Sequence, residues 1–452
     1  MQNEPPDHTA GIDFSPPASR LCHQRLALLR LWNLAKRHPL TRDRIPPSSA
    51  EDVKQDIFAT WSNIVPAAST DQLHRILQDG EYGSFHAIGT NDTTRRSSPI
   101  VTSTGGSTGK PKLLVNTYDE VLHDAFFQAK SYRLAGITPD DRVATLGGSG
   151  TYATDYSIYH ALGKIGCTIV PINDFRRAEE NCEILEALRV TVLLVLPSKL
   201  YPLLSHLEDR GRTLKDVRLI VTGGEPVSDQ LKGRARHCFG AHLALGSTFR
   251  TTDHGAIGYQ CAHCNDGEYH LHEGLQYVEL ISSEEGGVNE LVVSNLFCTY
   301  MPIVRVRSGD WAEWSDDHDH DHDHDHDRCR CGRTSRKIKI RGRTADIIMV
   351  GGEIISGQLF SKLPERVGVH ENLVQVLLQT GDDGVDRVVI ALDDVVRVRY
   401  EDKLRSSLMA DPVFARMTRE RRVFGPIFVA RHQSTETTRG YGKLRVFRDL
   451  RG

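Results

Sequence analysis

A short run of glycines, hydroxyl side chains and lysines stands out in the 452-residue chain. It reads TSTGGSTGKPK over residues 102–112 and follows the extended-looking SPIV at 98–101. Glycines allow backbone N–H groups to turn towards a bound anion, and serine and threonine hydroxyls add further donors. The run therefore predicts a loop that binds phosphate.

Two common phosphate-binding patterns do not fit this loop. A nucleoside-triphosphatase P-loop needs Gly-x4-Gly-Lys followed by Ser or Thr, whose hydroxyl binds magnesium. Here Gly109 and Lys110 are followed by Pro111, and Gly105 precedes Gly109 by four positions rather than five. The dinucleotide pattern G-x-G-x-x-G fails as well, because Gly105 and Gly106 are adjacent.

The loop is similar to the phosphate motif of the adenylate-forming superfamily, with its core S/T-G-S/T-S/T-G-x-P-K. The resemblance implies an α/β fold: a large N-terminal domain of α/β sheets with a β-rich subdomain, followed by a small mobile α+β C-terminal domain. It implies that the final lysine tethers the loop or touches phosphate. The implied ATP contacts are Ser103, Thr104, Gly105, Gly106, Ser107, Thr108, Gly109 and Lys112.

Two further motifs resemble the phenylacetate–CoA ligase branch of that superfamily. GGEP at 223–226 is similar to the branch's GAEP turn, which implies adenine contacts for Gly223, Gly224, Glu225 and Pro226. FRTTDHGAIGYQC at 249–261 is similar to Y-G-x-S/T-E, with ATP contacts at Phe249, Arg250 and Thr251. In this register Thr252 faces the α-phosphate, and Asp253 stands where a glutamate binds Mg²⁺. A second register, with LGSTF at 245–249, leaves no carboxylate for the metal.

Three later segments complete the series in the order that the family shows. VRVRSGD at 304–310 places Asp310 where a carboxylate accepts both ribose hydroxyls, a geometry that suits a vicinal diol. IRGRTADIIMVGGEIIS at 340–356 places Arg343 at the ribose and the domain junction, although Ala345 replaces the usual hinge aspartate. TRGYGKLRVFRDL at 438–450 aligns Lys443 with the family's catalytic lysine, a cation for the charge that develops during adenylation.

The resemblance implies a two-step ligase that uses ATP and Mg²⁺. A carboxylic acid is joined to AMP with release of pyrophosphate, and the acyl group then passes to a thiol such as coenzyme A. Tyr152, Tyr156 and Tyr159 would line an acyl pocket suited to an aromatic acid, or would pack in the core. The departures at Phe249, Asp253 and Ala345 make the chain more similar to aryl-acid adenylases of natural-product pathways, such as those acting on phenazine acids.

The sequence is also compatible with other acyl acceptors and with functions outside catalysis. The acyl group could pass to an acyl carrier protein, a protein cysteine or an amine instead of coenzyme A. The alternatives outside catalysis are a degenerate adenylase that only binds a nucleotide or aryl acid, and a metal-storage protein that uses the histidine tract. A homodimer is one assembly that the sequence allows. The presence of Lys112, Thr252, Asp310 and Lys443 favours an enzyme over a binder.

Cysteine spacing indicates a structural zinc site. Cys261 and Cys264 form a C-x2-C pair, and Cys329 and Cys331 form a C-x-C pair within CRCGR. Tetrahedral zinc takes four such ligands. Cys264 or one of the nearby histidines, His270 or His272, completes the set with Cys261; reduced thiols without metal are the alternative. The separate tract DDHDHDHDHDHD at 316–327 cannot build a core and is interpreted as a solvated insertion.

These residues must be positioned by alternating strands and helices. Short β-branched runs at 142–148, 167–172, 190–197 and 217–226 predict strands, and 119–135, 154–165 and 176–188 predict helices between them. This alternation is typical of a largely parallel α/β sheet. A helix is expected at 20–38, a β-rich section around 287–314, and a small α+β unit in the last hundred residues.

Length and composition indicate the number of domains and the expected partners and location. We predict two domains, 1–342 as an adenylation core and 343–452 as a C-terminal lid, because a chain of this length is too long for one core. The net charge of −3 gives no reason to expect a nucleic-acid partner. No apolar run reaches the roughly 18–20 residues of a membrane span. The N-terminus lacks the layout of a secretion signal, so a cytoplasmic location is expected.

Overall fold

The computed structural model describes the chain from Ser15 to Asp449, with gaps. It does not describe residues 1–14, 39, 46–52, 54, 70–71, 73–97, 104–112, 148–152, 174–177, 225–226, 228, 241, 283–288, 316–328, 344–346, 351–352, 370–372, 384, 393, 422, 431–446 and 450–452. At some further positions, among them 103, 147 and 343, it describes the backbone alone.

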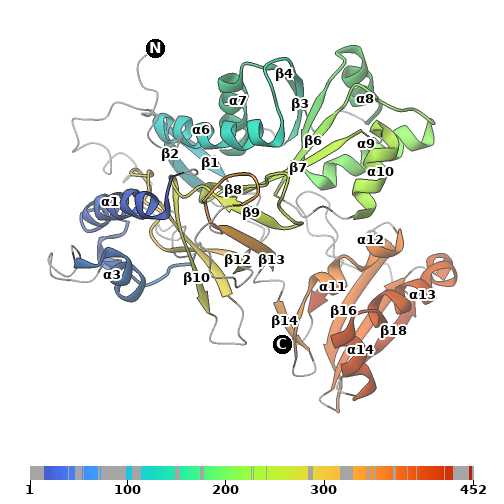
Figure 1. Ribbon diagram of the computed structural model, residues 1–452. Helices are drawn as coiled ribbons and strands as arrows, with labels where there is room; N and C mark the ends of the chain where they lie inside the picture. Colours follow the sequence, from blue (N-terminus) through green and yellow to red (C-terminus); the bar gives the residue numbers. More distant parts are fainter. Residues whose placement is uncertain are drawn as a thin grey trace.

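One mixed sheet of eleven strands dominates the fold, in the order β10-β11-β12-β13-β9-β8-β7-β6-β5-β3-β4 (Figure 1). Its parallel part consists of β3 (Arg142–Gly147), β4 (Thr168–Asn173), β5 (Val192–Val195), β6 (Leu219–Gly223) and β7 (Ala244–Thr251). Helix α6 (Tyr118–Ala135) precedes β3, and the helices between the strands are α7 (Ala153–Ile165), α8 (Ala178–Ala187), α9 (Pro197–Asp209) and α10 (Asp229–Phe239).

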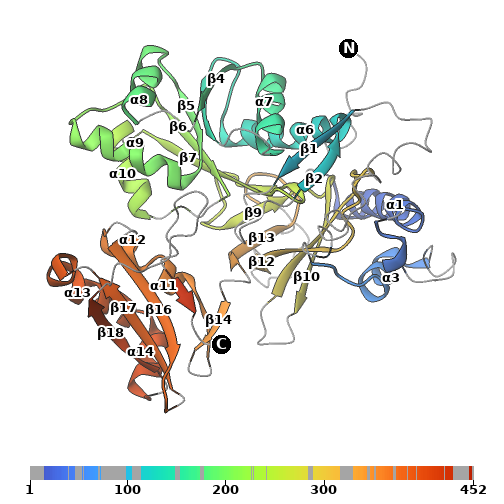
Figure 2. The ribbon, with the colours of Figure 1, turned by 180° about the vertical axis from the view of Figure 1, so that it is seen from behind.

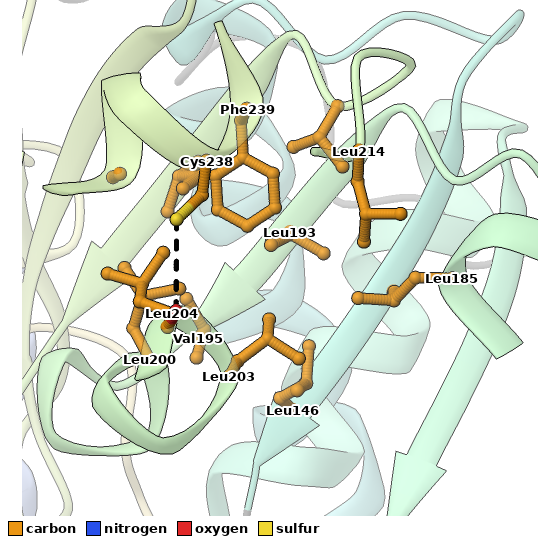
Figure 3. Packing of buried hydrophobic residues seen from close by; sticks show 14 of the residues in the cluster. Leu146, Leu185, Leu193, Val195, Leu200, Leu203, Leu204, Leu214, Cys238 and Phe239 are labelled. Carbon is orange, nitrogen blue, oxygen red and sulfur yellow. Dashed lines mark hydrogen bonds between the residues drawn. The ribbon is translucent and has the colours of Figure 1, made fainter. Parts of the chain in front are cut away.

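The parallel part is buried on both faces. Along β5, Val192 and Leu194 pack with α6 and α7, whereas Leu193 and Val195 pack with α8, α9 and α10. Side chains of a strand alternate between faces, so a continuous apolar run fits a strand covered by helices on both sides. Figure 3 shows the second of these cores, where Cys238 on α10 lies 3.8 Å from the Leu204 carbonyl on α9.

The sheet continues through antiparallel strands, and a separate hairpin precedes it in sequence. The antiparallel strands are β8 (Gly255–Tyr259), β9 (Glu268–Leu271), β10 (Gln276–Ser282), β11 (Asn289–Asn295), β12 (Val306–Trp314) and β13 (Lys337–Arg343). The hairpin consists of β1 (Pro99–Ser103) and β2 (Leu113–Thr117). The strands predicted at 142–226 are indeed parallel, and the β-rich section predicted after them joins the same sheet through antiparallel pairs.

The N-terminal helices pack against the antiparallel end of the sheet. These are α1 (Pro17–Ala35), the short 3-10 helix η3 (Arg42–Arg44) and α3 (Ile57–Ile64). Trp32 and Trp61 lie with ring centroids 6.2 Å apart in this contact. Buried Glu273 bridges Arg20 of α1, at 2.8 Å, and Arg336 next to β13, at 2.7 Å. The ion pairs thus fasten the first helix to the strands that carry the later motifs.

The C-terminal residues form their own sheet and core (Figure 2). The strands β14 (Ile347–Val350) and β15 (Glu353–Ser356) make a hairpin, and β16 (Val374–Thr380), β17 (Asp386–Leu392), β18 (Val423–Ala430) and β19 (Phe447–Asp449) make a sheet in the order β18-β17-β16-β19. The helices are α11 (Gln358–Ser361), α12 (Leu363–Val367), α13 (Asp394–Met409) and α14 (Pro412–Arg419). Phe360, Leu404 and Phe414 lie fully buried in the core of this unit.

The structure confirms the predicted α/β class and a separate α+β cluster near the C-terminus. The domain division at 342 and 343 stays a prediction, and β13 continues across that position to Arg343. Among the described residues, no helix is long and apolar enough to cross a membrane.

Helix α6 carries a buried histidine that should make stability depend on pH. The His123 ring stacks on Phe297 at 3.5 Å, and burial lowers the pKa of His123 from 6.5 to about 4. Between these two pH values the unfolded chain binds a proton that the folded chain excludes, so stability falls as pH drops from 6.5 towards 4. By pH 4 this loss reaches about 3 kcal/mol.

We expect His123→Phe to remove that part of the pH dependence. Urea unfolding of the parent and the variant at pH 7 and pH 4.5 would measure how the free energy of unfolding changes with pH. Exposed His237 on α10 provides a control, since His237→Gln should keep the parental slope. An unchanged slope in His123→Phe would contradict the assignment to this ring.

Candidate functional site

The predicted phosphate loop joins the two strands of the β1–β2 hairpin. Residues 104–112 lie outside the described residues, but Ser103 and Leu113 at their ends are paired across the hairpin. A P-loop instead leads from a strand into a helix. The local topology therefore agrees with the exclusion of a nucleoside-triphosphatase loop, while the phosphate contacts stay a prediction.

The GGEP turn lies directly beside strand β7. Gly223 ends β6 and pairs with Thr248 on β7. A Cβ at Gly223 would lie 3.3 Å from the carbonyl and hydroxyl oxygens of Thr248, so a side chain would crowd this approach. Gly224 has a φ of +74°, which favours glycine. Glu225 and Pro226 lie outside the described residues.

The predicted ATP segment that begins at Phe249 lies partly on β7 and partly in the turn after it. Phe249 lies on β7, with its ring centroid 5.5 Å from that of Tyr269. Thr252 and Asp253 follow in the turn before β8, and both are half-buried. The structure thus brings Phe249 to the position next to the GGEP turn, and its roles and those of Thr252 and Asp253 remain predictions.

His254 positions this turn, and sequence reasoning missed it. Its Nδ1 lies 2.8 Å from the Thr251 hydroxyl, and its Nε2 lies 3.2 Å from the Val306 carbonyl at the start of β12. Its own carbonyl accepts N–H groups from Gln276 and Asn295, at 2.8 and 3.2 Å. The buried imidazole therefore ties the β7–β8 turn to the strand that carries Asp310. Its one signal in the sequence is its place directly after FRTTD.

Asp310 and Arg343, both predicted at the ribose, lie opposite each other on neighbouring strands. They are register partners of β12 and β13. Asp310 is only 4% exposed, and it occupies the buried face of β12 with Val306, Ser308 and Ala312. A carboxylate among such neighbours is unusual in a structural strand. For Arg343 the backbone alone is described.

The structure describes two of the three tyrosines that were predicted to line an acyl pocket or to pack in the core. Tyr156 and Tyr159 lie on α7 and are 47% and 39% exposed, so neither packs in the core. Ser157 between them is buried and donates to Asp124 on α6 at 2.6 Å. Tyr152 and Lys443, the predicted catalytic lysine, lie outside the described residues.

Four of the predicted metal ligands converge. The ligand atoms of Cys261, His270, Cys329 and Cys331 all lie within 4.8 Å of one another, and we call these residues the Cys₃His cluster. Zinc–sulfur bonds of about 2.3 Å at tetrahedral angles separate two sulfurs by about 3.8 Å. The Sγ atoms of Cys261 and Cys329 are 3.8 Å apart, and Cys331 Sγ lies 3.5 Å from His270 Nε2.

The surroundings of the cluster orient its histidine and favour His270 over Cys264 and His272 as the fourth candidate ligand. His270 Nδ1 lies 3.1 Å from both the carbonyl and the hydroxyl of Ser335, which leaves Nε2 facing the thiols. Cys264 contacts Cys261 at 3.6 Å but is not one of the four. His272 is engaged elsewhere, 2.8 Å from the Ser131 hydroxyl. The donor set and spacing fit zinc.

Comparisons with known proteins agree with these motifs. Residues 60–269 match the AMP-binding enzyme family. The chain is 24% identical over 258 residues to the phenylacetate-coenzyme A ligase of Pseudomonas putida, covering 55% of this chain and 56% of that protein. It is 22% identical over 282 residues to the Escherichia coli (strain K12) phenylacetate-coenzyme A ligase, covering 60% of each. The matches therefore span well under two thirds of these relatives.

The solved structures extend the likeness to nearly the whole chain. The crystal structure of 2-hydroxyisobutyryl-CoA ligase in the postadenylation state, in complex with 2-HIB-AMP, covers 99% of this chain and 94% of its own, with a TM-score of 0.69. Its open conformation in complex with 2-HIB-AMP and CoA gives a TM-score of 0.68 over 99% and 96%. Both are 15% identical, so they show the shared fold alone. In its motifs, fold and relatives, the chain is similar to the adenylate-forming superfamily, and most similar in sequence motifs to the phenylacetate–CoA ligase branch.

Proposed function

We propose that this protein activates a carboxylic acid, preferably an aromatic one, with ATP and passes the acyl group to the thiol of coenzyme A. The observation that carries the proposal is the pairing of Asp310 with Arg343 on adjacent strands, because both were assigned to one ribose from separate motifs. The link from His254 to β12 supports it by holding the β7–β8 turn against the same strand.

The first step joins the acid to AMP. A carboxylate oxygen of the substrate attacks the α-phosphorus of ATP, and the bond from that phosphorus to the β-phosphate oxygen breaks, which releases pyrophosphate. Asp310 holds the ribose hydroxyls, Thr252 donates to the α-phosphate, and Lys443 offsets the charge between carboxylate and phosphate. Asp253 would hold Mg²⁺, a cation that prefers carboxylate oxygens and neutralises phosphate charge when bound.

The second step transfers the acyl group. The sulfur of coenzyme A attacks the acyl carbon, the carbon–oxygen bond to AMP breaks, and the thiol proton is released to solvent or a base. An acyl carrier protein would supply the same thiol chemistry. The likeness to phenylacetate-coenzyme A ligases and to a ligase solved in complex with CoA favours coenzyme A as the acceptor.

An ATP–pyrophosphate exchange screen over aryl and alkyl acids tests the first step, since the exchange needs no acceptor. We expect acid-dependent exchange with at least one aromatic acid. ATP binding measured by calorimetry without exchange for any acid would favour the non-catalytic alternative. Adding coenzyme A, a carrier protein or an amine to an active pair then identifies the acceptor by the release of AMP.

We also propose that the Cys₃His cluster holds a structural zinc ion. The ligands come from the start of the β8–β9 connection, from β9 and from the residues before β13, so the metal would clamp three segments of the sheet. Burial raises the pKa of the Cys261 thiol to about 11, and bound zinc would favour the thiolate. Adenylation needs a cation at phosphate and has no step for a metal bound by three thiolates.

We expect one zinc per chain in protein that lacks residues 316–327, so that the histidine tract cannot contribute. Cys331→Ser should lose most of this zinc and unfold at a lower temperature, whereas Cys264→Ser should retain it, because Cys264 lies outside the four. Elemental analysis and thermal denaturation provide the readouts. Equal zinc content in the two variants would refute the cluster as the metal site.

A further inference from the structure

Arg250, at the glycine position of the Y-G-x-S/T-E pattern, extends a buried guanidinium from β7 towards helices α6 and α7. Its Nη2 lies 3.3 Å from Asp124 Oδ2 on α6, and the two side chains are 11% and 16% exposed. The resemblance places residue 250 among the ATP contacts. Its guanidinium contacts Asp124 of α6, which also accepts the hydroxyl of Ser157 in the segment predicted to line the acyl pocket.

Asp124 is held independently of Arg250. Its Oδ2 accepts the Ser157 hydroxyl of α7 at 2.6 Å, and its Oδ1 accepts the Ala256 N–H at 2.7 Å. Gly255 has a φ of +78°, and a Cβ there would lie 2.5 Å from Asp124 Oδ1. The glycine therefore permits a close approach that fixes the carboxylate, and the carboxylate in turn fixes one edge of the guanidinium.

Two further donor atoms of Arg250, Nε and Nη1, have no acceptor in the part of the chain that the structure describes. Both atoms are buried. A buried charged donor without an acceptor is costly, and such groups concentrate where a ligand supplies the missing partner. An arginine immobilised by a carboxylate and left with free donors is organised to bind an acceptor from outside the chain.

We propose that Arg250 determines substrate specificity by donating to a second oxygen acceptor on the acid, apart from the carboxylate that reacts. This inference rests on the proposed function, because it places the acyl substrate between β7 and α7. The acids selected would carry a carbonyl or a further carboxylate in addition to the reacting group. A site built to satisfy such an acceptor discriminates strongly against an analogue that lacks it.

A series of substituted benzoates tests the proposal. Toluates, acetylbenzoates and benzenedicarboxylates carry, at the ortho, meta or para position, a substituent with no acceptor, a neutral acceptor or an anionic acceptor. ATP–pyrophosphate exchange and calorimetric binding of the acids are measured for the parent protein, Arg250→Lys and Ser157→Ala. Lysine keeps a cation beside Asp124 but lacks the donors at Nε and Nη1. Ser157→Ala alters the Asp124 contacts and spares those donors.

In the parent, we expect the acceptor-bearing acid at one ring position to give exchange rates and affinities about 10- to 100-fold higher than the toluate substituted at the same position. This is the range for a hydrogen bond from a charged donor. That ratio should fall close to one in Arg250→Lys and persist in Ser157→Ala. The acetyl and carboxylate arms distinguish a neutral from an anionic acceptor. An unchanged ratio in Arg250→Lys, or an equal loss for all acids, would overturn the proposal.

Failure of the proposed function would look different. No acid would then support exchange in any variant, while calorimetry would still report whether the parent prefers acceptor-bearing acids. Far-UV circular dichroism and melting temperature confirm folding of each variant, and Arg250→Gln serves as a second substitution if Arg250→Lys does not fold.

Discussion

A Lys443→Ala variant is expected to form acyl-adenylate about 100- to 1,000-fold more slowly than the parent chain, the usual cost of removing one group that stabilises developing charge. Affinity for ATP should change little, because the cation acts where carboxylate and α-phosphate meet in the transition state. Pyrophosphate release under single-turnover conditions measures the step. Lys443 lies outside the described residues, and this prediction rests on GYGKLR at 440–445.

Two comparisons isolate the role of Lys443. Chemically prepared acyl-adenylate should pass to coenzyme A at a near-parental rate in the variant, since the lysine is assigned to adenylation alone. Lys403 on α13, which lies over the Tyr400 ring at 5.6 Å, provides a matched control in the C-terminal part. Lys403→Ala should keep parental adenylation. Unchanged pyrophosphate release in Lys443→Ala would remove the assignment.

An Asp310→Ala variant should bind ATP about 100-fold more weakly, because it loses two charge-assisted hydrogen bonds to the ribose. The position is buried on β12, so a melting temperature must accompany the titration. Calorimetric titration with ATP gives the affinity, and 2′-deoxy-ATP gives an independent check. The parent should bind the deoxy nucleotide less tightly than ATP, whereas Asp310→Ala should bind both alike.

The same strand supplies the control for Asp310. Glu313 lies three residues further along β12, is half-exposed and forms an ion pair with Arg341 on β13. Glu313→Ala removes a carboxylate without touching the predicted ribose site, so ATP affinity should stay parental. Parental discrimination between ATP and 2′-deoxy-ATP in Asp310→Ala would show that this carboxylate does not contact the sugar.

Local pattern was sufficient to predict most elements of the parallel part. The apolar run at 190–197 contains β5, and the segments at 119–135 and 154–165 match α6 and α7 within one residue at each end. Side-chain periodicity and composition predict these elements. They do not predict that the β-rich section joins the same sheet, because pairing between β9 and β13 depends on contacts about seventy residues apart in sequence.

In the candidate site, too, local motifs predicted single residues but not the contacts between distant elements. Motifs identified Asp310 and Arg343, but their placement as strand partners depends on the β12–β13 register, which no local pattern encodes. His254 and the Arg250–Asp124 pair were not predicted, since each acts through a contact with a distant element. The choice of His270 over Cys264 likewise needed the position of Ser335 and the CRCGR segment.

The connection from β12 to β13 is anchored where it rejoins the sheet. Cys329 contacts Cys261, and Ser335 contacts His270, before β13 begins at Lys337 and pairs back to Asp310. The entropy of closing such a connection grows only slowly with its length. We therefore expect changes in the length or sequence of the acidic histidine repeat to have little consequence for Asp310 and Arg343, the residues predicted at the ribose, so that a reporter or an affinity tag could be inserted in the same interval.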